Sequence, residues 1–94
     1  MKTIEGFRLR KLGDEYILVG ETLALINFNK MVTLNETAAF LWKEAEKESV
    51  EQGGFTIEAL CAALCEAYEV TSEMAQKDVT ATVASWQEAG VIES

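Results

Sequence analysis

Residues 31–42 read MVTLNETAAFLW and contain an abrupt change of secondary-structure signal. The β-type run of residues 31–34 is followed at once by Asn35, a favoured N-cap residue, and by Glu36, which suits the first turn of a helix. The following residues, through Trp42, continue as a helix. This stretch therefore predicts a strand joined to a helix by a single residue, and such a junction fixes how the two elements pack.

The segment before this junction carries strand signals. Residues 7–12, FRLRKL, alternate apolar and basic side chains, which is the period of a half-buried strand. Gly13-Asp14 is a turn signal, and residues 15–19, EYILV, are rich in strand-forming side chains. These features predict a β-hairpin, with residues 31–34 as a third strand. Residues 20–30 are interpreted as a connector that could carry a short strand or a helical turn.

The segment after the junction carries three helix signals. The first helix is expected over residues 36–48, with the apolar face Ala38, Leu41, Trp42 and Ala45. Thr56 predicts the cap of a second helix over residues 57–68. A third helix begins after a cap at Thr71 or Ser72 and ends at a glycine, Gly90, and residues 91–92 can pack back on its last turn.

The order of three strands and then three helices predicts an α+β fold close to a winged helix. The 94 residues suffice for one domain over residues 1–94 with its own core. No apolar run approaches the ~18–20 residues needed to span a bilayer, and residues 1–6 contain no apolar signal-peptide region, so a cytoplasmic location is the default expectation.

The net charge of −8 is unevenly spread. Residues 1–30 carry a net charge of +1, and residues 31–94 carry −9. The helical part should therefore repel phosphate groups, which makes nucleic acid a poor candidate partner. A basic peptide, or a basic patch on another protein, is a more natural partner.

The residues that usually carry catalysis or bind metals are scarce. The chain has no histidine, so it has no histidine general base and no Ser-His-Asp triad. Cys61 and Cys65 lie four residues apart on one helix face, which is poor geometry for a disulfide, and we read them as two small buried hydrophobic residues. The acidic group at Glu44, Glu46, Glu48 and Glu51 is read as a solvated face rather than a cation site. We therefore expect a binding module without catalytic activity, cofactor or metal.

Several segments resemble the PqqD family. They are GFRLR at residues 6–10, YILV at residues 16–19, the opening stretch at residues 31–42, and FTIEAL at residues 55–60. The closing pattern Asp78-Val79-x3-Val83-x2-Trp86-x3-Gly90-Val91-Ile92 also resembles that of the family. The resemblance covers roughly residues 6–92. It implies a winged-helix-like peptide recognition element that presents the leader segment of a ribosomally made precursor peptide to a radical SAM maturase.

The resemblance also implies where the leader binds. The leader would add as a strand to the edge of the third strand and lie against the third helix, a mode known as β-augmentation. On the strand, the implied peptide-binding residues are Met31, Val32, Thr33 and Leu34. On the helix, they are Ala75, Asp78, Val79, Thr82, Val83 and Trp86. The alternative for the apolar members of this set is a place in the core, and Asp78 could be an ordinary surface acid.

Two other functions remain open from the sequence. One is a winged-helix DNA-binding transcription regulator, which fits the order of elements. A recognition helix normally carries basic residues. The third helix region, however, contains three acidic residues, Glu73, Asp78 and Glu88, and a single basic residue, Lys77. A subunit that binds only a partner enzyme, and no peptide, is the third possibility.

Overall fold

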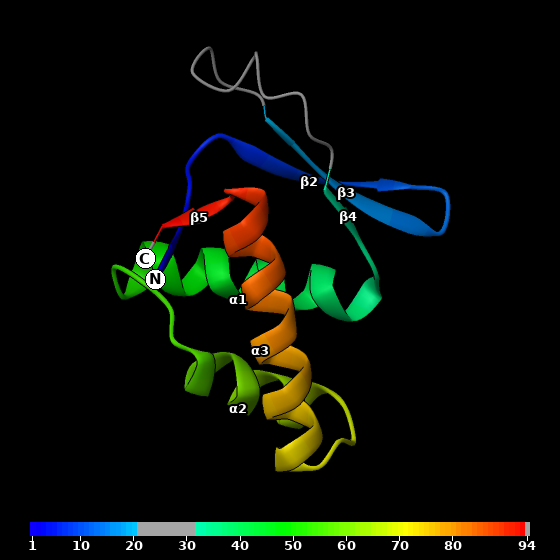
Figure 1. Cartoon of the computed structure of the whole chain (residues 1–94), viewed down its shortest axis with the longest axis vertical. Coiled ribbons are helices and arrows are strands. Elements are labelled where there is room, and N and C mark those ends of the chain that lie inside the picture. The colour runs from blue at the N-terminus through cyan, green and yellow to red at the C-terminus, as the bar shows by residue number, and fades with distance from the viewer. Residues whose placement is uncertain (21–31, 94) are drawn as a thin grey trace.

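A computed structural model describes residues 1–20 and 32–93 of the chain. Strands β2 (Phe7–Leu12), β3 (Glu15–Gly20) and β4 (Val32–Leu34) form an antiparallel sheet in the order β2-β3-β4 (Figure 1). A two-residue turn joins β2 to β3, and its first residue, Gly13, has a φ of 65°, a left-handed conformation that favours glycine. The predicted hairpin and third strand are thus confirmed. Gly20, which was assigned to the connector, belongs to β3, and the predictions for residues 21–31, Met31 included, fall outside the described part.

Three helices follow the sheet: α1 (Glu36–Glu51), α2 (Ile57–Ala67) and α3 (Ser72–Ala89). Each helix is capped by the side chain of the residue before it, which accepts a hydrogen bond from a backbone N–H in the first turn, at 2.8 Å for Asn35, 3.1 Å for Thr56 and 3.2 Å for Thr71. Such a cap stabilises a helix by about 1 kcal/mol. Gly90 ends α3 with a φ of 77°. The α+β class with three strands followed by three helices is confirmed, although α1 runs three residues further than the expected end at residue 48.

A second, two-stranded sheet joins the two ends of the described chain. Strand β1 (Lys2–Thr3) pairs with β5 (Ile92–Glu93) beside the C-terminal end of α1 (Figure 1). The loop before α2 holds the same segment, because Phe55 N–H donates to the Met1 carbonyl at 2.6 Å. Gly54 is required here: a Cβ at this position would lie 2.8 Å from the Met1 carbonyl oxygen. The loop that contains Gly54 therefore also anchors the N-terminal segment.

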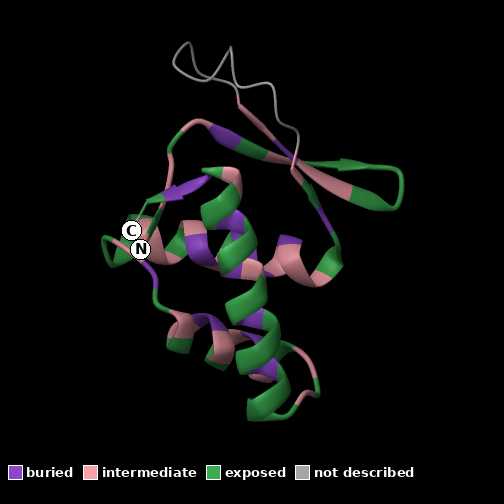
Figure 2. Cartoon of the chain, viewed as in Figure 1, coloured by how far each residue is buried: buried purple, intermediate pink, exposed green. Residues whose placement is uncertain are grey.

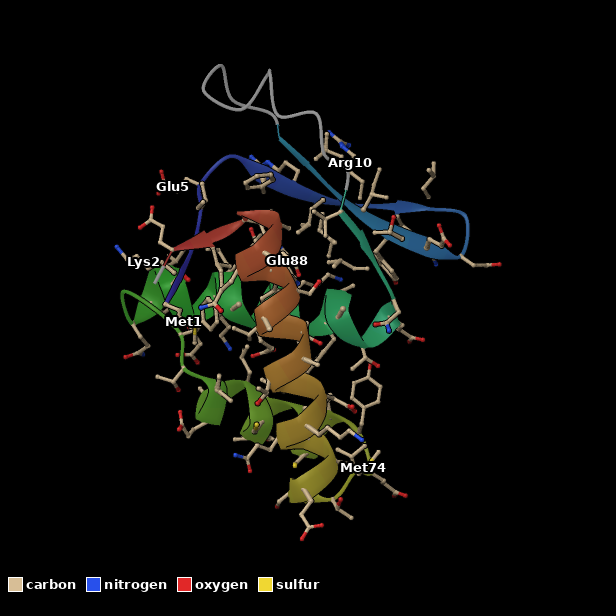
Figure 3. All side chains as sticks on the ribbon, viewed as in Figure 1. Met1, Lys2, Glu5, Arg10, Met74 and Glu88 are labelled. Carbon is tan, nitrogen blue, oxygen red and sulfur yellow. The ribbon has the colours of Figure 1, made fainter. Side chains whose placement is uncertain are left out.

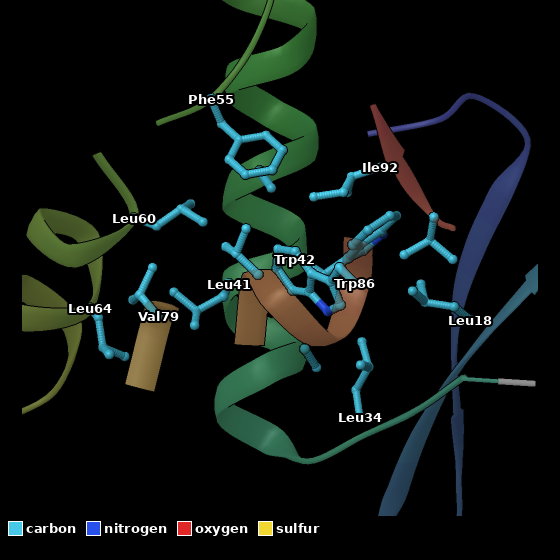
Figure 4. Packing of buried hydrophobic residues seen from close by; sticks show 14 of the residues in the cluster. Leu18, Leu34, Leu41, Trp42, Phe55, Leu60, Leu64, Val79, Trp86 and Ile92 are labelled. Atoms are coloured by element: carbon cyan, nitrogen blue, oxygen red, sulfur yellow. The ribbon is translucent and has the colours of Figure 1, made fainter. Parts of the chain in front are cut away.

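The core lies among the three helices and extends to the inner face of the sheet (Figures 2 and 4). Its largest side chains are Trp42, Trp86 and Phe55, which are fully buried. On α1 the buried set is Ala39, Leu41, Trp42 and Ala45. Ala38, which was expected on the apolar face, is only half-buried, because the core-facing side of the first turn is centred on Ala39. Within residues 1–20 and 32–93, no helix combines the length and the apolar character needed to cross a membrane.

Candidate peptide-binding site

Strand β4 is an edge strand in the described part of the chain. It pairs with β3 on one side, through Leu18↔Val32, Ile17↔Thr33 and Tyr16↔Leu34, and no other described strand pairs with its opposite side. An edge strand presents backbone N–H and C=O groups that can accept a further strand. The predicted third strand is therefore placed where an added peptide could extend the sheet.

The register identifies which backbone groups of β4 face outward. The two-residue turn makes Leu12 and Glu15 a hydrogen-bonded pair, and such pairs alternate with non-hydrogen-bonded pairs along an antiparallel ladder. Glu15 therefore directs its backbone groups toward β2. Because the direction alternates along β3, the even-numbered residues direct their backbone groups toward β4. Val32 and Leu34 therefore face β3, and the alternation leaves the N–H and C=O of Thr33 directed at the open edge.

The side chains of β4 alternate in the same way. Leu34 is buried, Val32 is half-buried and packs against the core, and Thr33 is exposed. Since successive side chains of a strand point to opposite faces, Val32 and Leu34 lie on the helix side of the sheet. Leu34 thus anchors the strand, and Val32 is the strand side chain that an added peptide could contact on the helix side.

The predicted residues of α3 divide into two stripes. Ala75, Val79, Val83 and Trp86 are all buried within the core, with exposed fractions of at most 2%. Their side chains therefore pack in the core beneath the site and do not reach its surface. Asp78 is exposed and Thr82 is half-buried, and these two lie on the neighbouring stripe of the helix.

A pocket connects this second stripe to the end of β4. It has a volume of about 260 Å³, and we call it the junction groove; its lining residues are Asn35, Thr37, Ala38, Asp78, Ala81 and Thr82. The structure thus brings Asp78 and Thr82 together with the strand–helix junction. Sequence reasoning did not assign Asn35, Thr37, Ala38 or Ala81 to the site. The first three follow directly after the predicted edge strand, and that adjacency is the signal that could have found them.

The charges around β4 and α3 are predominantly acidic. Of the described residues that line the junction groove, only Asp78 carries a charge. The basic Arg8 and Arg10 lie on β2, which β3 separates from β4 (Figure 3 labels Arg10). On α3, Glu73, Asp78 and Glu88 outnumber Lys77. This face is therefore better suited to a cationic ligand than to a phosphate backbone.

The two cysteines lie elsewhere, on α2. Both are free thiols that are half-buried and pack against the core, so the prediction of buried hydrophobic residues holds only in part. They line a pocket of about 370 Å³ between α2 and the start of α3, opposite Ser72 and Gln76. Burial is the main cause that raises the pKa of Cys61 above 9.0, followed by the influence of Cys65 and Glu58. A raised pKa makes Cys61 a poor nucleophile at neutral pH.

Metal binding finds no support in the described part of the chain. Among residues 1–20 and 32–93, no three His, Cys, Asp or Glu side chains are grouped so that they could hold a metal ion. This result includes the acidic residues near the end of α1.

Two solved structures share this fold. One is TbiB1 in complex with the TbiA(beta) leader peptide, which is 17% identical, with a TM-score of 0.69 over 100% of this chain and 96% of that chain. The other is lasso peptide synthetase B1 complexed with the leader peptide, which is 18% identical, with a TM-score of 0.72 over 99% of this chain and 96% of that chain. At these identities the likeness establishes the fold. No curated protein sequence matches the chain.

The sequence itself matches a family model. The model is described as coenzyme PQQ synthesis protein D (PqqD), and it matches residues 15–92, from β3 to β5. The match includes β4, the junction groove and the whole of α3. The chain therefore belongs to the PqqD family.

Proposed function

We propose that this protein is a non-catalytic module that binds the leader segment of a ribosomally made precursor peptide and presents it to a radical SAM maturase. The observation that carries the proposal is the open edge of β4 beside the junction groove. Membership of the PqqD family supports it, and so do the two structures of the same fold, each of which is a complex with a leader peptide.

In the proposed complex the leader adds to β4 as a further strand. Backbone hydrogen bonds at the edge, through the N–H and C=O of Thr33, contribute affinity that does not depend on the peptide's sequence. Each such bond adds about 0.5–1.5 kcal/mol net. Selection then comes from the side chains that the leader places against Val32 and into the junction groove.

The difference in burial between the two stripes of α3 reduces the number of residues in the proposed site. Among the described members of the predicted set, those whose groups reach the surface are Val32, Thr33, Asp78 and Thr82. Leu34 and the buried stripe of α3 hold β4 and the helix in place. Met31 is retained from the sequence prediction as a residue that precedes the edge strand.

DNA binding is the alternative function, and charge argues against it. The exposed side of α3 is acidic, whereas a recognition helix that enters the major groove normally carries arginine or lysine. A mobility-shift assay at low salt with random-sequence duplex DNA tests this point directly. Salt-dependent binding at micromolar protein would support a DNA-binding regulator.

The main experiment is an NMR titration of the ¹⁵N-labelled protein with the precursor peptides encoded beside its gene. We expect the amides of residues 32–34 and 75–86 to shift with the full precursor and not with the same precursor lacking its leader. If no leader shifts these amides, the proposal fails. Pull-down of the radical SAM enzyme from the same gene neighbourhood, with and without leader, separates peptide presentation from binding to the enzyme alone.

A further inference from the structure

We infer that Asp78 makes this module selective for leaders that place a lysine or arginine side chain in the junction groove. The inference rests on the proposed addition of a leader to β4. It concerns the chemical class of leader that the site accepts, which strand addition alone leaves open because backbone hydrogen bonds are common to all peptides.

The position of the groove makes it accessible to a peptide on β4. Asn35 follows the last residue of β4, and Thr37 and Ala38 lie in the first turn of α1, so one wall of the groove continues directly from the edge strand. The opposite wall is α3, through Asp78, Ala81 and Thr82. A peptide strand that extends past Leu34 would therefore pass the groove and could direct a side chain into it.

The groove contains a charged acceptor that no described residue uses. Asn35 Oδ1 already accepts the Ala38 N–H at 2.8 Å. Asp78, by contrast, has no hydrogen bond or ion pair with any described residue, and it carries the only charge among the described lining residues. The nearest base in the sequence, Lys77, lines a separate depression on another side of α3 together with Glu73. The carboxylate of Asp78 is thus available to a cation from outside.

Lysine and arginine side chains suit both the charge of the groove and its apolar lining. Their aliphatic stems can pack on the methyl groups of Ala38 and Ala81 while the cationic head reaches Asp78. A glutamate or aspartate at the same leader position would meet the Asp78 carboxylate and be disfavoured by like-charge repulsion. Exposed ion pairs change affinity by about two- to fivefold, and a pair that the bound leader shields from water is expected to reach the upper end of this range.

The test is an in vitro display selection with a library of random 16-residue peptides, carried out on four forms of the full chain: wild type, Asp78→Asn, Asp78→Lys and Glu73→Lys. Wild type is expected to enrich lysine or arginine at one fixed distance from the apolar positions that define the bound strand. Asp78→Asn should enrich the same apolar positions without the basic one, and Asp78→Lys should enrich aspartate or glutamate there. Glu73→Lys is the matched control, because it makes the same charge change on the same helix outside the groove and should keep the basic preference.

Affinities of one selected peptide complete the test. Replacing its basic residue by glutamine should weaken binding to wild type by about two- to fivefold and leave binding to Asp78→Asn unchanged. The inference would be overturned if the enriched peptides had no basic position, or if the basic preference survived in Asp78→Asn. Neither result would contradict the proposed binding of the leader to β4. If wild type enriches no peptide and the neighbouring precursors do not bind either, the proposed function itself fails.

Discussion

The indole rings of Trp42 on α1 and Trp86 on α3 meet edge to face, with ring centroids 5.2 Å apart and planes at 87° (Figure 4). Both rings are fully buried, and Phe55 packs edge to face on Trp86 at 6.3 Å. Aromatic pairs of this geometry contribute about 0.5–1.5 kcal/mol beyond their buried area. The contact fixes α3 relative to α1, and those are the two helices that form the walls of the junction groove.

Replacing Trp86 by phenylalanine should therefore destabilise the protein, but by less than the ~3–5 kcal/mol typical of truncating a buried Trp to alanine. The smaller ring leaves a cavity. However, the substitution also removes a buried Nε1–H that has no hydrogen-bond partner among the described residues, a group whose burial is costly. Urea denaturation followed by circular dichroism measures the change, with the exposed Gln87→Ala as control. A loss as large as that of Trp86→Ala would contradict this account.

Local signals predicted most of the fold. Three of these signals are the N-cap at Asn35, the turn at Gly13-Asp14 and the glycine at the end of α3. Each depends on only a few neighbouring residues, so it can be recognised directly in the sequence. The β1–β5 sheet was missed because its two-residue strands pair across almost the whole chain and have no local pattern.

The site was predicted only in part, for a geometric reason. On a helix, positions 75, 79, 83 and 86 form one stripe, and positions 78 and 82 lie on its flank. The apolar pattern identifies the first stripe, but it does not reveal which flank meets the end of β4. That depends on the crossing of α1 and α3 in three dimensions, and so the groove became visible only in the structure.

Neutralising Glu46 should stabilise the protein at neutral pH. Burial is the largest influence on its carboxyl and raises its pKa above 4.5, while the positive charge of Arg8 and the Trp42 indole act in the opposite direction. The Trp42 Nε1–H is not in hydrogen-bonding geometry with any described group, so its effect is the weakest of the three. The charged form of Glu46 is therefore less favourable in the folded chain than in the unfolded chain.

The sign of the pH dependence follows from this difference. Between pH 4.5 and the raised pKa, the folded state binds more protons than the unfolded state, so the free energy of unfolding falls as the pH rises through this window. Glu46→Gln should accordingly raise the Tm modestly at pH 8, and the gain should shrink as the pH is lowered toward 4. Glu44→Gln, which removes the same charge from the same helix, is the control. A gain from Glu46→Gln that does not change with pH would show that net charge alone is responsible.

The thiol of Cys61 should react slowly in the folded protein. Because burial raises its pKa above 9.0, little thiolate is present at pH 7.5, and the thiolate is the nucleophile. In a Cys65→Ser variant, which leaves Cys61 as the single cysteine, we expect iodoacetamide to alkylate the folded chain several-fold more slowly than the same chain in urea. The difference should narrow above pH 9. Equal rates for the folded and unfolded chains at pH 7.5 would contradict the role of burial.

Thr33→Pro should weaken leader binding and leave the fold intact. Proline lacks an N–H, and the register of β4 directs the Thr33 N–H at the open edge, so the pairing with β3 loses no hydrogen bond. The lost bond to an added strand corresponds to about 0.5–1.5 kcal/mol, or roughly a two- to tenfold weaker Kd. Isothermal titration with a leader peptide measures the change, and Thr33→Val, which keeps the N–H, should bind like wild type. Unchanged binding by a folded Thr33→Pro protein would place the leader away from the β4 edge. If the variant unfolds instead, the prediction that the pairing of β4 with β3 tolerates a proline at position 33 is wrong.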